Sequence, residues 1–529
     1  MVLSIRELEW GQDNMSEKYD LNNLPKEKFV LATDVDRTHD VKFDTKPIGY
    51  LADAWRRFKK NKASVAALII IIFLLIFAAL GPLFIPRNYT KAYVTDKYLM
   101  RYQYLNPRLK FMGRSGIWDG SKKLDISEAT YLSLRARGVE TGKDPVEYVI
   151  KEYQTGDDIM GYTNMKVVKV NTYYNIDIWT LTLIESEYLE LQEWQNEHNI
   201  QLILPYSENN KNNFNIWYKI DERLTAVLDE NGNFIPNYLQ EGEDLYDSLR
   251  LEADPYNSGD IEHRWRYAKR SGLPGQFNYV VRIDPYEYFI YKYGFEPAFA
   301  FGTDSNGYDI FTRLASGARF SLLLAILVSA INLTIGAIYG AIEGYYGGVT
   351  DLIMERISDI LADIPFMVVT ILFQLHLGGK IGVIPALIYA FVLTGWIGMA
   401  GRVRMQFYRF KNQEYILAAR TLGAKDWRIM FKHIFPNSLG TIITGSVLVI
   451  PGVIFSETSL TYLGIINLDS PTMSSVGAML SNGQGQMAKY PFLILFPSLF
   501  IALLMISFNL FGNGLRDAFN PSLRGTDEE

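Results

Sequence analysis

One uncharged apolar run constrains the fold of this chain more than any other feature. Residues 63–84 read ASVAALIIIIFLLIFAALGPLF and contain no Asp, Glu, Lys or Arg. A helix of about 20 apolar residues is long enough to cross the ~30 Å hydrocarbon core of a bilayer. The run therefore predicts a transmembrane helix, and it excludes a simple soluble globule for the whole chain.

Five further apolar runs follow in the second half of the chain. They cover residues 319–342, 352–377, 381–400, 441–465 and 490–512. Together with the first run they predict six transmembrane helices, so both termini lie on the same side of the membrane. Lys and Arg gather just before the first run and in 402–440, and this bias assigns both segments and both termini to the cytoplasm. We expect a multi-pass protein of the cell (plasma or inner) membrane.

Composition changes along the chain predict five regions. The 214 residues 87–300, which lie between the first two apolar runs, are polar and rich in tyrosine. They mix strand-like alternation (165–184) with helical patterns (185–199 and 242–253). They predict an extracytoplasmic α+β domain. The expected regions are 1–45, a cytoplasmic tail; 46–86, a surface helix and the first transmembrane helix; 87–300, the extracytoplasmic domain; 301–524, a membrane core with five transmembrane helices and the cytoplasmic loop 402–440; and 525–529, a C-terminal tail.

The segment GYLADAWRRFKKNK precedes the first apolar run. Leu51, Ala54, Trp55 and Phe58 fall at positions i, i+3, i+4 and i+7, which places them on one face of a helix. A basic end and an apolar face favour a short amphipathic helix lying on the membrane surface. The alternative is an ordinary basic flank.

Motifs of catalysis are missing from this sequence. It contains no GxxxxGK[ST] for a nucleotide, no HExxH for a metal, no GxSxG before a helix and no cysteine. We therefore expect no catalytic residue, no metal site and no cofactor in this chain. A net charge of -6 gives no support to nucleic-acid binding.

The cytoplasmic loop contains the most specific pattern, EYILAARTLGAKDWRIMFKHIFPNSL. It predicts a short helix from Glu414 to Leu422, a turn at Gly423 and a second short helix from Asp426 to Ile434, followed by Pro436. Asp426 caps the second helix or lies in its first turn, and Trp427, Met430, Phe431 and Ile434 form an apolar stripe. Helices this short need a protein surface or lipid headgroups for stability. The alternative is an ordinary amphipathic loop.

The pattern E-Y-x-x-A-A-R-x-L-G-A followed by H-I-x-P-N resembles the EAA loop of ABC importer permeases. Residues 301–322, 344–365 and 508–524 resemble three further segments of that family, in the same order. Together they resemble the C-type subunit of oligopeptide/dipeptide importers. The resemblance implies an α-helical membrane protein with six transmembrane helices of the ABC importer permease type. It also implies peptide import through a path of which this chain forms half.

The resemblance further implies partners and a docking role for the loop. In the family this loop is a coupling helix that docks on a cytoplasmic ATPase. The implied partners are a second homologous permease subunit, two cytoplasmic ATPase subunits that would hold ATP and Mg, an extracytoplasmic peptide-binding protein and the lipid bilayer. The coupling residues that match are Glu414, Ala418, Ala419, Gly423, Asp426, Trp427, Met430, Phe431 and Pro436.

Three positions depart from the family pattern. Leu417 stands where an acidic residue is usual, Tyr308 where Arg is common, and Val476 where Trp is usual. The 214-residue outside region also far exceeds the family's short linker. Relatives of this design carry peptides, nickel chelates or glutathione, so a non-peptide solute such as a nickel chelate is the alternative substrate.

Polar residues within apolar runs are hypotheses for the translocation path. Glu457, with Ser456 and Thr458 beside it, lies in the fifth run, and Gln374 lies in the third. Ionisable residues inside a membrane are functional hypotheses by default. The alternative for Glu457 is a carboxylate hydrated at the interface or paired within the bundle.

Glycines form a second pattern within the membrane. Gly336 and Gly340 begin a four-residue repeat that permits close helix packing. The partner helix is expected either in another permease or within this chain.

The outside region admits two interpretations. It receives a binding protein or peptide through its tyrosines, or it is a packing element without a ligand. A membrane receptor with an extracytoplasmic sensor domain is the alternative function for the whole chain.

Overall fold

A computed structural model describes residues 50–112, 117–157, 161–205, 216–236, 268–273 and 276–519. The predicted tails 1–45 and 525–529 and the helical pattern at 242–253 lie outside the described residues. The chain divides into two units, 1–56 and 57–529. The predicted amphipathic segment is a helix, α1 (Tyr50–Lys60), in which Phe58 is buried and Trp55 is 47% exposed. Its place on a membrane surface remains a prediction.

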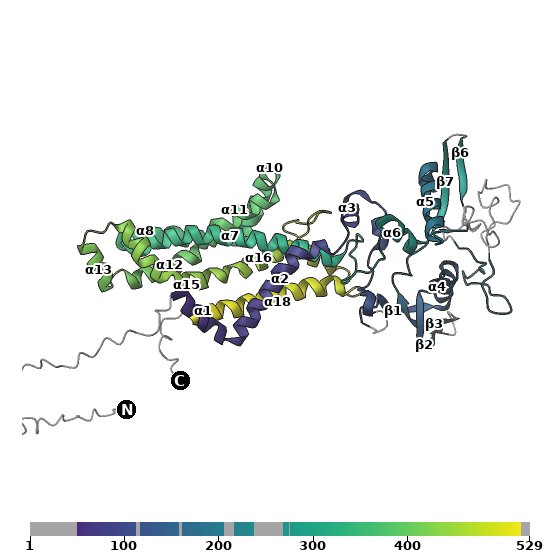
Figure 1. The fold of residues 1–529 in the computed structure, drawn as a ribbon, viewed down its shortest axis with the longest axis horizontal. Helices are drawn as coiled ribbons and strands as arrows, with labels where there is room; N and C mark the ends of the chain where they lie inside the picture. Colours follow the sequence, from purple (N-terminus) through teal and green to yellow (C-terminus); the bar gives the residue numbers. More distant parts are fainter. Residues whose placement is uncertain are drawn as a thin grey trace, which may run out of the picture. The chain divides into compact units, whose positions relative to one another are not determined.

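Within the described residues, five helices are long and apolar enough to cross a membrane, or six if one bent pair counts as a span. Several of them contact one another lengthwise, as Figure 1 shows for α7, α12, α15, α16 and α18. Their bounds are α2 (Lys62–Leu80) with the short η2 (Gly81–Leu83); α7 (Ile310–Tyr346); α11 (Val383–Gly395) with α12 (Ile397–Phe410); α14 (Asp426–Arg428), η8 (Ile429–Ile434), α15 (Phe435–Val447) and α16 (Val449–Tyr462); and α18 (Phe492–Phe519).

The third predicted span is a bent pair rather than one straight helix. The structure bends the chain by 72° between α8 (Gly348–Ala362) and α9 (Phe366–Phe373). Pro365 explains the bend, because a proline disfavours helical backbone at the residue before it. Asp363 occupies the C-cap position of α8. The chain then continues through η7 (Gln374–Gly378) and α10 (Gly379–Ile381) toward α11.

The fifth predicted span is interrupted one turn before Pro451. The helical pattern breaks at Leu448, between α15 and α16. Proline has no N–H, and its ring clashes with the carbonyl group four residues earlier, here that of Val447. The break at Leu448 therefore lies where the proline disturbs the helix.

The glycine pattern packs α7 against α12 within this chain. A side chain at Gly336 would lie 2.7 Å from the carbonyl oxygen of Trp396, and one at Gly340 would overlap the carbonyl group of Ala400. Gly344 meets Arg404 and Phe407 in the same way. Of the two expectations, these contacts favour packing within the chain over packing on another permease.

The bundle core forms where α2, α7, α11, α16, α17 (Val476–Gln484) and α18 meet. Its buried members include Leu74, Ala318, Ala325, Leu460 and Phe496. Val476, where the family usually has Trp, begins α17 and is fully buried in this core. It therefore serves as a packing residue.

Residues between α2 and α7 form the mixed α+β region that the sequence indicated. One antiparallel sheet has the order β1-β3-β2, and a second has β4-β7-β5 with β6 paired to β7. Figure 1 labels β1, β2 and β3 of the first sheet and β6 and β7 of the second. The bounds are β1 (Ser121–Ser127), β2 (Val146–Asp157), β3 (Gly161–Asn171), β4 (Trp179–Ile184), β5 (Ile203–Leu204), β6 (Lys269–Leu273), β7 (Gln276–Ile283), α3 (Arg87–Thr95), η3 (Leu99–Tyr102), η4 (Lys110–Met112), α4 (Glu128–Thr141), α5 (Glu185–His198) and α6 (Pro285–Tyr293). The strands expected in 165–184 and the helix expected in 185–199 are confirmed.

The tyrosines of this region fill its core. Tyr89 is fully buried, and the rings of Tyr93, Phe289, Tyr293 and Phe299 lie 5.2–5.5 Å from its own. Aromatic rings bury a large apolar area and pack edge to face at such distances. For these residues the structure favours the packing interpretation over contact with a peptide.

Candidate functional site

The loop after α12 folds as two helices that reverse around one glycine. α13 (Glu414–Thr421) ends where the N–H of Gly423 donates to the carbonyl oxygen of Arg420 and that of Ala424 to Ala419, both at 3.0 Å. Gly423 has φ +79, a conformation that residues with a Cβ rarely adopt. The predicted first helix and the turn are confirmed. A Cβ at Gly423 would meet nothing within 4 Å, so its backbone conformation, and not a lack of space, requires the glycine.

One face of the loop packs against the helix bundle. Ile416, Ile429 and Ile434 are fully buried, and Met430 is nearly so. They form one cluster with residues of α7 and α12 that includes Phe407. The loop and the helices on which it lies therefore share one packed core.

A polar contact also joins the loop to the end of α7. The hydroxyl of Tyr345 donates to Oδ1 of Asp426 at 2.6 Å. Arg420 lies 3.4 Å from the same hydroxyl and stands over the tyrosine ring. Asp426 lies in the first turn of α14, one of its two expected positions.

On its side away from the bundle the loop exposes four apolar side chains among charged ones, and we call these four the outer face. It consists of Tyr415, Leu417, Leu422 and Trp427, with Leu422 at 87% and Trp427 at 64% exposure. The Trp427 ring lies 4.0 Å from that of Phe431, which holds it in place. The predicted stripe is thus divided, because Met430 and Ile434 point inward while Trp427 points outward. Exposed apolar groups gathered in this way mark interaction surfaces.

The second loop helix does not end before Pro436, which corrects the sequence prediction. α14 continues through the π-helical η8 into α15, and Asp426–Tyr462 forms one long helical segment. Pro436 occupies the first turn of α15, and a wider π-helical turn precedes it. A proline is tolerated where its missing N–H has no helical partner to bond. The loop is consequently continuous with the fifth span.

An ion-pair network beside the loop joins α8 to α12. Arg404 donates to both oxygens of Asp351, at 2.6 and 2.8 Å, and to both oxygens of Glu355, at 2.8 and 3.1 Å. Glu343 on α7 lies 3.6 Å from the same guanidinium. The sequence alone does not predict this network, because nothing local pairs residue 351 with residue 404.

The predicted path residues do not form one site. Glu457 is fully buried, and it accepts hydrogen bonds from Ser321 at 2.8 Å and Thr461 at 3.2 Å. Thr458 is buried against Gly477 of α17, and Gln374 donates to the carbonyl oxygen of Val383 at 2.9 Å. For Glu457 these contacts favour pairing within the bundle, the alternative that the sequence left open.

Ser456, the remaining path residue, lines a cavity that the sequence analysis missed. The cavity has a volume of about 330 Å³ and is also lined by Asn332, Thr394 and the rings of Phe366 and Phe391. Asn332 is buried, and its Oδ1 has no hydrogen-bond partner among the described residues. A lone asparagine inside the apolar run 319–342 was the signal that could have identified it.

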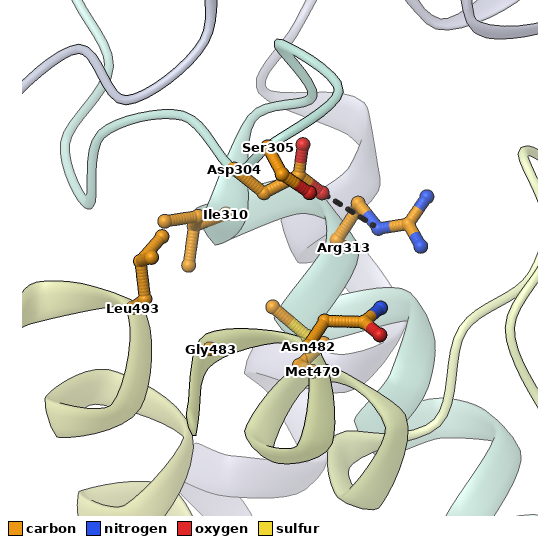
Figure 2. A pocket seen from close by; sticks show the side chains of 8 residues that line it. All are labelled: Asp304, Ser305, Ile310, Arg313, Met479, Asn482, Gly483 and Leu493. Carbon is orange, nitrogen blue, oxygen red and sulfur yellow. Dashed lines mark ion pairs between the residues drawn. The ribbon is translucent and has the colours of Figure 1, made fainter. Parts of the chain in front are cut away.

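A buried arginine, Arg313, lies near the N-terminal end of α7, the end away from the loop. Arg313 pairs with Asp304 and Asp469, and Asn482 donates to Asp469 at 2.7 Å. Figure 2 shows the first pair, with Asn482 below it in this view. Burial raises the pKa of Asp304, and it raises the pKa of Asp309, the residue that caps α7, to about 6. Arg313 therefore offsets a carboxylate whose burial is unfavourable.

Tyr308 connects the N-terminal end of α7 to residues 87–300, which we call the inserted region. Its ring stacks on that of Tyr93 at 4.2 Å, and its hydroxyl donates to the carbonyl oxygen of Tyr93 at 3.0 Å. The guanidinium of Arg313 stands over the same ring. The departure from Arg at this position thus coincides with contacts to Tyr93, which belongs to the inserted region.

Two family models match the chain. The model described as "Binding-protein-dependent transport system inner membrane component" matches residues 332–525, and "N-terminal TM domain of oligopeptide transport permease C" matches residues 49–107. Over 224 residues the chain is 45% identical to the oligopeptide transport system permease protein OppC of Bacillus subtilis (strain 168). The aligned residues cover 42% of this chain and 72% of that protein. The chain belongs to this family of transport permeases, as a C-type subunit.

A second curated relative agrees with that assignment. The chain is 42% identical to the dipeptide transport system permease protein DppC of the same organism over 225 residues, which cover 42% of this chain and 69% of that one. A solved inward-facing MetNI methionine ABC transporter is similar with a TM-score of 0.31 and 13% identity, covering 39% of this chain and 94% of that chain.

Membership of the family settles three general points. This permease is a multi-pass inner-membrane protein and a transporter subunit rather than a catalytic enzyme. Neither family model matches residues 108–331, which contain both sheets.

Proposed function

We propose that this permease imports peptides as part of an ATP-driven complex. In this proposal it forms half of the path with a second homologous permease, and two cytoplasmic ATPase subunits that hold ATP and Mg bind its loop. An extracytoplasmic peptide-binding protein delivers the substrate. The similarity to oligopeptide and dipeptide permeases supports peptides as the substrate class.

The two-faced loop is the observation that carries the proposal. Its inner face is buried, while Leu422 and Trp427 of the outer face are exposed. An ATPase bound to the outer face could shift the loop only together with α7, α12 and the long helix that begins at Asp426. Closure of the ATPase subunits would in this way move the spans between two packed arrangements, as ligand-driven switching requires.

The length of α7 supports the proposed topology. Its 37 residues correspond to about 55 Å, more than the ~30 Å hydrocarbon core. Tyr345 at one end contacts the loop, and Tyr308 beside the other end contacts the inserted region. If the loop is cytoplasmic, residues 87–300 are extracytoplasmic. Counting the bent pair as one span gives six spans, with both termini cytoplasmic.

The variant Leu422→Ser tests whether the outer face is the docking surface. We expect Leu422→Ser to weaken association with the ATPase subunits about tenfold, because burial of a leucine side chain contributes about 1.5 kcal/mol or more. The permease itself should fold normally, since Leu422 is 87% exposed. The measurement is the amount of ATPase that co-purifies with the full chain, together with peptide uptake by reconstituted vesicles.

Phe111→Ser is the matched control for this variant. Phe111 is 84% exposed but belongs to the inserted region, so its loss should leave ATPase association unchanged. Equal association of the Leu422→Ser variant and the unmodified chain would contradict the docking role.

A further inference from the structure

A polar cleft lies where the inserted region meets the segment before α18. It has a volume of about 570 Å³, within the ~300–1,000 Å³ typical of ligand sites. Tyr490 of the membrane core forms one wall. Residues of the inserted region form the rest, and those used below are Lys97, Arg101, Gln103, Tyr104, Lys122 and Asn175.

The cleft carries an excess of positive charge. None of Lys97, Arg101 and Lys122 forms an ion pair with any residue that the structure describes, although Arg101 stacks over the Trp179 ring at 4.7 Å. The acidic residue in the lining, Asp177, is already paired with Arg137 at 2.5 Å. A ligand that enters the cleft therefore meets three cations without carboxylate partners among the described residues.

An aromatic pair forms a preformed wall of the cleft. The rings of Tyr104 and Tyr490 stack at 4.3 Å and are nearly parallel, and the Lys122 ammonium stands 5.1 Å from the centre of the Tyr490 ring. Tyr104 has φ +58, a left-handed conformation that is uncommon for a residue with a side chain. Such a conformation persists only where its surroundings fix it, and it holds the Tyr104 ring against Tyr490.

We propose that this cleft binds the C-terminal carboxylate of a peptide substrate. The inference rests on the proposed function and names the substrate group that the inserted region recognises. The three cations attract a carboxylate and repel a free amino terminus. The tyrosine pair offers a flat surface to a side chain, and the amides of Gln103 and Asn175 can bond a peptide backbone. A bound peptide would touch both the inserted region and Tyr490, two residues before α18.

The test compares one peptide in two forms. Full-length chain in lipid nanodiscs is titrated with Ala-Ala-Tyr-Ala-Ala carrying a free carboxylate, and with the same peptide as its C-terminal amide. We expect the free acid to bind about fivefold or more tightly, the effect of one exposed charge contact. Lys122→Gln should weaken binding of the acid by a similar factor and leave binding of the amide unchanged.

Lys123→Gln is the matched control because it removes the same charge from the same strand. Successive residues of β1 point to opposite faces, so Lys123 lies on the face away from Lys122. Equal binding of acid and amide, or equal losses in the two variants, would overturn the inference. Peptide uptake and ATPase co-purification test the proposed function separately, and both would persist if only the carboxylate site were wrong.

Discussion

Replacement of Glu140 by alanine is expected to destabilise the inserted region by about 3–5 kcal/mol. The Glu140 side chain is 1% exposed, and its oxygens accept from Arg282 at 2.6 and 3.1 Å. The Arg282 side chain is completely buried. Without the Glu140 carboxylate, the buried Arg282 guanidinium loses this ion pair and both of its hydrogen bonds to Glu140. Replacing them with water requires the region to open.

Hydrogen exchange of the β4 and β7 amides measures this effect. Exchange should accelerate about a hundredfold or more in Glu140→Ala, because local opening becomes easier by that free energy. Glu152→Ala is the matched control. Glu152 pairs with Lys166 at 3.1 Å but is 63% exposed, so its loss should cost less than about 1 kcal/mol.

A double replacement separates loss of charge from loss of packing. Met at both Glu140 and Arg282 removes the pair together, and exchange should return toward that of the unmodified chain. Unchanged exchange in Glu140→Ala alone would show that water or another group already compensates Arg282.

Gly340→Ala is expected to destabilise the bundle by about 2–3 kcal/mol, as overpacking of a tight contact does. A methyl group there would overlap the backbone carbonyl of Ala400 on α12, and backbone cannot rotate away as a flexible side chain can. The two helices would have to separate, which also disturbs the neighbouring contact of Gly336. Thermal unfolding of the purified chain in detergent measures the loss.

Gly398→Ala supplies the control for this prediction. Gly398 lies on α12, and a methyl group added there meets nothing within 4 Å. The variant should be unchanged or more stable by up to about 1 kcal/mol, since alanine favours a helix over glycine. Unfolding of both variants at one temperature would mean that the Gly340 contact is not tight.

Features set by local sequence were predictable. Five of the six apolar runs correspond to helices long and apolar enough to cross a membrane, because about 20 apolar residues leave few alternatives. The run 352–377, which contains four charged residues, forms a bent helix pair instead. The turn at Gly423 and the helices on each side of it follow from residues within one short segment. The mixed strands and helices of the inserted region likewise follow from local alternation and periodicity.

Features set by distant partners were not predictable. Arg404 meets Asp351 across 53 residues, and Ser321 meets Glu457 across 136. A single sequence contains no signal for either pair, so Glu457 suggested a pathway when its hydroxyl partners were unknown. The abundance of tyrosine had the same ambiguity, because composition does not distinguish a buried ring such as Tyr89 from an exposed one.

The chain contains no cysteine, so one introduced at Leu422 is a unique label site. Cells that express Leu422→Cys are treated with a membrane-impermeant maleimide before or after the membrane is opened. The proposed function predicts labelling only after opening, and protection when the ATPase subunits are bound. Labelling of intact cells, or full labelling in the presence of bound ATPase subunits, would contradict it.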